Sequence, residues 1–194
     1  KPSVNIAFEN GNIGSVTTSP DGVCVIVASA IANGGFALNT PYTVYSLAEA
    51  EALGIIPTIA GNYELHKTIK EFYAEAGSGT ELWIYGVAKT RTLDQLVGDS
   101  VEVLLASNRR IRFVVAKYAP SADDDEVTAG LRTGFPATLA SAQLIAETYT
   151  EEKTQPLVFI LEGYNYTGVA ADLVGFSATT YNRVIVMVGD TETR

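Results

Sequence analysis

Residues 38–88 read LNTPYTVYSLAEAEALGIIPTIAGNYELHKTIKEFYAEAGSGTELWIYGVA. The pattern predicts a strand, two helices and a second strand, over residues 38–46, 47–53, 62–76 and 80–87. Ser46 and Glu49 form a capping box at the start of the first helix, and Gly54 is expected to end it. No catalytic constellation lies within the stretch, which therefore indicates a scaffold rather than an enzyme.

The second helix is predicted to begin at Asn62, as its N-cap, and to end at Gly77. Its apolar positions recur at helical spacing, at Leu65, Ile69, Phe72, Tyr73 and Ala76. An amphipathic helix of this kind is expected to lie on a sheet.

Apolar strands separated by helices continue on either side of this stretch. Further strands are expected over residues 23–31, 111–117, 157–161 and 184–188. Further helices are expected over residues 99–106, 136–152 and 169–174, with Asp99 as a cap and a helical region opening at residues 123–126. The alternation predicts an α/β fold: a mainly parallel, mixed sheet with helices on both faces, formed by residues 21–194.

An extended N-terminal arm is expected before this domain, over residues 1–20. Val4, Ile6 and Phe8 alternate with polar or small residues, which is typical of a strand with one face to bury. Turn residues follow at 10–14 and 19–22. We expect Val4, Ile6 and Phe8 to serve as an assembly interface.

Composition excludes several classes of partner. Charged residues make up 18% of the 194 residues and the net charge is −9, so phosphate-backbone binding is not expected. The only basic cluster is Arg109, Arg110 and Arg112. No apolar run approaches the roughly 20 residues of a membrane span. We therefore predict no nucleic-acid partner and no membrane association.

Catalytic and cofactor motifs are not found. His66 is the only histidine, placed within an amphipathic helix, and Cys24 is the only cysteine, placed within an apolar strand. A phosphate-binding glycine loop and a nucleophile elbow are both missing. The prediction is a protein that is not an enzyme, with no catalytic, cofactor-binding or metal-binding residues and no cofactor.

Two polar segments leave alternatives open. The carboxylates of residues 123–126 suit a helix N-terminus, although carboxylates after a strand also suit a cation. The segment EGYNYTG at residues 162–168 is interpreted as a packed loop, with a pocket or an interface as the alternative.

Several stretches resemble the sheath proteins of contractile phage tails and of related phage-like injection systems. Residues 41–54, PYTVYSLAEAEALG, resemble the sheath segment in which a strand is followed by serine and a short helix ending in glycine. Residues 65–87 resemble the helix, glycine turn and strand that follow. The family's later helix and strands are matched by residues 142–146, 156–161 and 184–190.

The resemblance implies a structural subunit of a contractile tail sheath, which assembles into helical rings around an inner tube and rearranges on contraction. Its partners would be copies of itself and the inner tail tube, the latter through a C-terminal region. Its location would be a virion tail or phage-like particle, made in the bacterial cytoplasm. The chain starts without methionine and ends at Arg194, so we expect the N-terminal arm and outer domain of a longer sheath protein.

Two other functions remain open. The first is a flavodoxin-like domain that binds a small molecule or is enzymatic, with a site formed by the loops after Lys117 and Leu161. The second is a partner-binding module from a different assembly. Both are compatible with a mainly parallel sheet.

Overall fold

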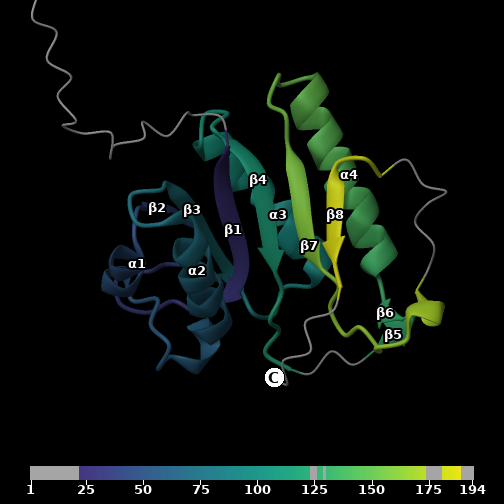
Figure 1. The fold of residues 1–194 in the computed structure, drawn as a ribbon, viewed down its shortest axis with the longest axis horizontal. Coiled ribbons are helices and arrows are strands. Elements are labelled where there is room, and N and C mark those ends of the chain that lie inside the picture. The colour runs from purple at the N-terminus through teal and green to yellow at the C-terminus, as the bar shows by residue number, and fades with distance from the viewer. Residues whose placement is uncertain (1–21, 123–125, 129, 174–180, 189–194) are drawn as a thin grey trace, which may run out of the picture.

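A six-stranded sheet organises the computed structural model, which describes residues 22–122, 126–128, 130–173 and 181–188. The strands are β1 (Val23–Ala30), β2 (Pro41–Val44), β3 (Leu82–Ala88), β4 (Ile111–Lys117), β7 (Val158–Glu162) and β8 (Val184–Met187). They lie in the order β2-β3-β1-β4-β7-β8 (Figure 1). Only β2 runs antiparallel to its neighbour, so the predicted mainly parallel, mixed sheet is confirmed.

Helices lie on both faces of the sheet, as the sequence predicts. They are α1 (Leu47–Leu53), α2 (Tyr63–Ala76), α3 (Leu93–Ala106) and α4 (Phe135–Glu151), with short 3-10 turns η1 (Ala60–Asn62) and η2 (Ala170–Asp172). The helices α1 and α2 pack on β2, β3 and β1, whereas α3 and α4 pack on the opposite face (Figure 1). The expected helix over residues 169–174 is only the single turn η2.

The core consists of two apolar layers divided by the central strand β1. Its side chains alternate: Val23, Val25 and Val27 join the layer under α3 and α4, and Ile26, Ala28 and Ala30 join the layer under α1 and α2. All six are buried. The continuous apolar run of β1 is therefore the consequence of cover on both faces.

The helix α1 begins and ends where its capping residues predict. Ser46 Oγ accepts a hydrogen bond from the Glu49 N–H at 3.2 Å. The Glu49 carboxylate accepts the N–H of Tyr45 at 2.8 Å, one residue before the expected one. Gly54 ends the helix with φ 109°, which L-residues rarely adopt.

The prediction that Asn62 is the N-cap residue of α2 is confirmed, but the expected capping by its side chain is wrong, because the side chain makes no capping hydrogen bond. The buried amide instead accepts the Ile31 N–H at 2.9 Å and donates to the Ile31 carbonyl at 3.0 Å. The amide thus supplies hydrogen bonds to the backbone N–H and carbonyl just beyond β1, where the hydrogen bonds of the sheet have ended.

The prediction that Asp99 begins a helix is also wrong. The helix α3 begins at Leu93, after a capping box in which Thr92 and Gln95 satisfy each other's backbone N–H groups. Asp99 lies within the helix and forms an ion pair with Arg91, with Nε and Oδ2 3.0 Å apart. The signal was present as Thr-x-x-Gln, one variant of the capping box.

The segment before α4 differs from the predicted helical region. Residues 123–125 lie outside the described residues. The residues after them form a small antiparallel hairpin of β5 (Val127–Thr128) and β6 (Leu131–Arg132). The helix α4 then starts at Phe135, with Pro136 in its first turn, where a missing N–H costs nothing.

Candidate assembly surface

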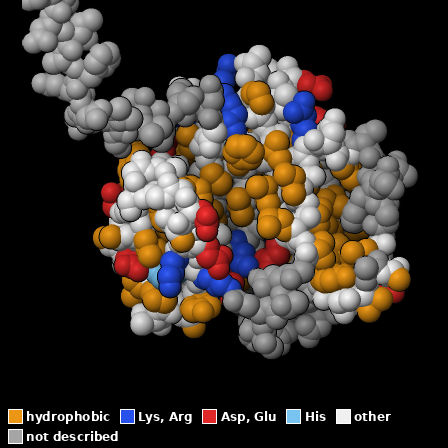
Figure 2. All heavy atoms as spheres, in the orientation of Figure 1, with side chains coloured by type: hydrophobic (Ala, Val, Ile, Leu, Met, Phe, Trp, Pro, Cys, Tyr) orange, Lys and Arg blue, Asp and Glu red, His pale blue; other side chains and the backbone are white. Residues whose placement is uncertain are grey.

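Among the described residues, one half of the sheet has a helix layer on only one of its faces. In β4, β7 and β8 the side chains of one parity pack beneath α3 and α4. On the other face, Lys117 and Glu162 lie at the ends of β4 and β7. The remaining side chains of that face are apolar and form a surface that we call the open half-sheet: Phe113, Val115, Val158, Ile160, Ile185 and Met187. Figure 2 shows this surface as a continuous band of hydrophobic side chains across the centre of the molecule.

The exposure of this surface is unusual for a parallel sheet. Phe113 is 39% exposed, Ile185 50% and Met187 63%. Parallel strands are normally covered on both faces, and a contiguous exposed apolar patch marks an interaction site in most soluble proteins. The helices α1 and α2 extend only as far as Val115, which packs at the edge of their layer.

A groove borders the open half-sheet at the carboxyl ends of its strands. Its volume is about 610 Å³, and it lies between α2 and the ends of β4, β7 and β8. Its lining residues are Lys67, Thr68, Glu71, Val115, Ala116, Lys117, Ile160, Glu162, Met187 and Val188. Val115, Ile160 and Met187 belong to both the groove lining and the open half-sheet, so the two are continuous.

Lys117 connects the two walls of this groove. Its Nζ lies 3.3 Å from Glu64 Oε2 on α2 and 3.0 Å from Glu162 Oε2 at the end of β7. Nearby, burial lowers the pKa of Lys89, an effect that the charge of Glu64 opposes. These ion pairs hold α2 against the end of the sheet.

His66 and Cys24 are engaged in packing. His66 is 7% exposed, and its Nε2 lies 2.9 Å from Glu51 Oε1, so it connects α2 to α1. Cys24 is partly buried in β1, and burial raises the pKa of its thiol to about 12. The thiol is therefore protonated at neutral pH and is a poor nucleophile.

The tyrosines of the two loops that follow β4 and β7 pack against each other. Tyr118 and Tyr164 meet edge to face, with ring centroids 4.9 Å apart, and both are buried. The Arg132 guanidinium lies over the Tyr118 ring at 5.3 Å. Tyr166 is partly buried against the core under α3 and α4. This arrangement confirms the packed-loop interpretation of residues 162–168 for Tyr164.

Other predicted residues cannot be placed on this surface. Val4, Ile6 and Phe8 lie outside the described residues, as do three of the four carboxylates at 123–126; Glu126 is exposed. Within the described ranges, no three His, Cys, Asp or Glu side chains gather as metal ligands would. None of the described helices has the length and apolar character that a bilayer crossing needs.

The fold and the surface define a doubly wound α/β domain with one half-face open for contacts. The family description "DUF2586, N-terminal domain" matches residues 1–190. The chain therefore belongs to this family. A comparison with curated proteins found no match. The family description names no activity.

Sequence reasoning predicted the strands of the open half-sheet but not that, among the described residues, one of their faces lacks a helix layer. The connection between β7 and β8 does not explain this, because a right-handed crossover there lies on the same face as α4. The strands themselves carry no signal of it, since apolar residues on both of their faces indicate cover on both sides.

Proposed function

We propose that this chain is a structural subunit of a contractile tail sheath, made up of the arm and outer domain. In this role it assembles into helical rings around an inner tube and rearranges on contraction. It acts through contacts with copies of itself and makes or breaks no covalent bond. The open half-sheet is the observation that carries the proposal, since a structural subunit needs an apolar surface that stays uncovered until assembly.

The size of the surface favours weak single contacts. Covering Phe113, Ile185 and Met187, each about half exposed, would contribute roughly 2–5 kcal/mol. Association costs of a similar size oppose this gain. A lone pair of subunits would therefore dissociate readily, whereas a lattice with several contacts per subunit would hold together. Weak, repeated contacts also suit a sheath that must rearrange.

Negative-stain microscopy of the concentrated protein, as this chain and within the gene product that contains it, tests the proposal. Helical tubes or stacked rings are the expected result. Particles that remain monomeric in every condition of salt and crowding would overturn it.

A small-molecule site is the second candidate, and the strand order favours it. Numbered among themselves, the parallel strands follow the order 2-1-3-4-5, which is that of flavodoxin-like folds. Such folds bind ligands at the carboxyl ends of the strands, where the groove beside Lys117 and Glu162 lies. A thermal-shift screen with nucleotides, flavins and divalent ions tests this function, because a ligand of the folded state raises its stability. A raised melting temperature would support it, and no shift with any of them would remove it.

A further inference from the structure

We infer that α4 of a second copy covers the open half-sheet. This inference rests on the proposed function and names the partner surface that assembly would use. The contacting residues of α4 are those of its outward side, which we call the outer stripe: Pro136, Ala137, Ala140, Ser141, Leu144 and Thr148.

From Pro136 to Leu144 the outward side of α4 carries no charged residue; the partly exposed Glu147 and the exposed Glu151 follow on the same side. The members of the outer stripe recur at intervals of three and four residues, so they share one face. Leu144 is 64% exposed, and the stripe's alanines and serine permit close approach of a flat apolar surface. The outward sides of the other helices are charged, with Lys70 and Glu75 on α2 and Asp94 and Glu102 on α3. A solvent-facing helix side is normally polar.

The dimensions of α4 match the surface that it would cover. Its 17 residues span about 25 Å, while the five residues of β7 span about 17 Å. Within its own copy α4 already lies across the other side of β7 and β8 (Figure 1). A second α4 on the open side would complete the cover that a parallel sheet normally has.

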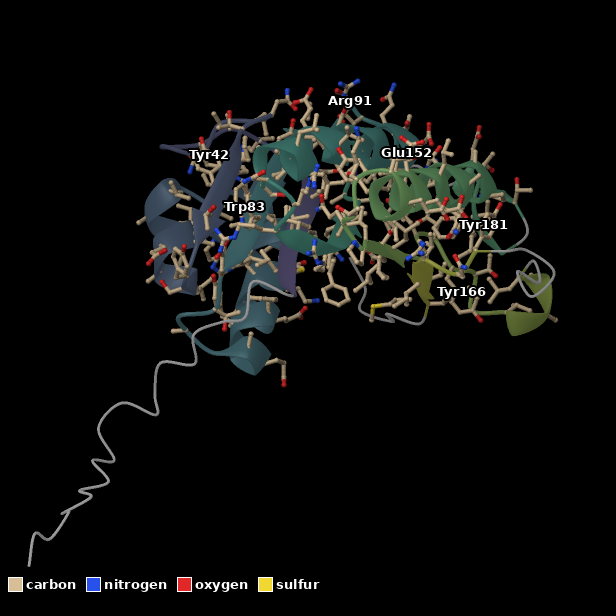
Figure 3. All side chains as sticks on the ribbon, turned by 90° about the horizontal axis from the view of Figure 1, so that it is seen from above. Tyr42, Trp83, Arg91, Glu152, Tyr166 and Tyr181 are labelled. Carbon is tan, nitrogen blue, oxygen red and sulfur yellow. The ribbon has the colours of Figure 1, made fainter. Side chains whose placement is uncertain are left out.

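Charges at one end of the two surfaces are complementary. Glu151 and Glu152 are exposed at the end of α4, on the helix-layer side of the molecule, where Figure 3 labels Glu152. Arg112 directly precedes the open half-sheet residue Phe113. These groups lie at the same end of the sheet, because the guanidinium of Arg109 donates to Thr154 Oγ1 at 3.3 Å.

Two copies stacked in the same orientation would therefore bring the acidic end of one α4 to the basic end of the other open half-sheet. Such matched potentials fix the register of an interface more than they add affinity.

The outer stripe and the open half-sheet lie on opposite sides of the domain. A contact between them uses different surfaces on the two partners, so the pair keeps one free surface of each kind, one on each subunit. Such heterologous contacts extend without limit unless a rotation closes them into a ring. Stacks and rings are the forms that a sheath requires.

Sedimentation of the 194-residue chain tests the inference. The concentration should reach about 1 mM, because weak contacts have dissociation constants of this order. Wild type is expected to form species that grow beyond dimers with concentration. Leu144→Asp and Met187→Asp should each lower the association constant at least tenfold. An equimolar mixture of the two variants should form heterodimers and stop, because only one pair of intact surfaces remains. Heterodimer formation also shows that both variants are folded.

Leu105→Asp is the matched control, since Leu105 on α3 is also 64% exposed; it should associate like wild type. Unchanged association of Leu144→Asp would overturn the inference, even where Met187→Asp weakens it, and would favour residues 1–21 as the cover. A wild-type chain that stays monomeric, or a mixture that does not pair, would overturn it as well. Tubes seen by microscopy in those cases would leave the proposed function standing.

Discussion

Phe36 packs directly on the backbone of Gly86, and this contact fixes the edge of the sheet beside β2. Phe36 is 1% exposed, and a Cβ placed on Gly86 would overlap its ring. The Gly86 carbonyl also accepts the N–H of Asn39 at 2.8 Å. The close approach of the Phe36 ring therefore requires a glycine at this position of β3.

Gly86→Ala is expected to destabilise the fold. The added methyl group must displace a fully buried ring, and overpacking of this kind costs about 1–3 kcal/mol. Gly98→Ala is the matched control: Gly98 lies on the exposed side of α3 with nothing near its Cβ position. It should stabilise the protein by about 0.5–1 kcal/mol. Urea unfolding of the two variants measures both changes in the free energy of unfolding. Equal changes would contradict the contact between Phe36 and Gly86.

Cys24 should make the folded protein less stable as the pH rises into the alkaline range. Burial raises the pKa of its thiol from 9.0 to about 12, so the unfolded chain loses the proton first. The resulting stability is complete below pH 9.0 and is lost as the pH rises toward the folded value. At about pH 10.5 the loss attributable to this thiol is about 2 kcal/mol.

Urea unfolding of wild type and Cys24→Ala at about pH 8 and about pH 10.5 measures this loss. The wild type should lose more stability than the variant across this interval. Parallel losses would show that the thiol titrates alike in both states.

The sequence predicted those elements whose signals are local. The run from Val23 and the glycine after Leu53 needed only neighbouring residues to be interpreted, and both predictions are confirmed. Asn62 shows the limit of local signals. Its position suited a helix cap, but its side-chain amide hydrogen-bonds the backbone of Ile31, 31 residues earlier. Hydrogen bonds between residues so far apart in the sequence leave no local pattern.

The candidate surface was accessible to sequence reasoning only in part. The apolar strands at residues 111–117 and 157–161 were predicted, and their two apolar parities indicated cover on both faces. That α2 extends no farther than Val115 depends on how the helices pack, which no periodicity encodes. The open half-sheet therefore became visible only in three dimensions.

Lys117→Met should destabilise the junction between α2 and the sheet. It removes the cation between Glu64 and Glu162, whose carboxylates lie 3.3 and 3.0 Å from Lys117 Nζ. We expect a loss of about 1–3 kcal/mol, since the carboxylates are left partly buried without their cation. Lys70→Met is the control, because Lys70 lies exposed on the same helix as Glu64; it should change stability by less than about 0.5 kcal/mol.

The alternation at residues 3–9 gives the sharpest test of the arm. If Val4, Ile6 and Phe8 bind a neighbouring subunit as a strand, changing all three to serine should abolish the rings or tubes that the protein forms. Main-chain pairing would remain possible, but the side chains that give register and burial would be lost.

The control changes the other face of the same segment. Asn5 and Glu9 alternate with the apolar residues, so Asn5→Ser and Glu9→Gln should leave assembly intact. Removal of residues 1–10 should abolish assembly, while circular dichroism and the melting temperature stay as in wild type, because the described strands and helices lie at Val23 and beyond. Assembly that survives this deletion would refute a role for the arm, and equal loss in both face variants would show that alternation does not matter.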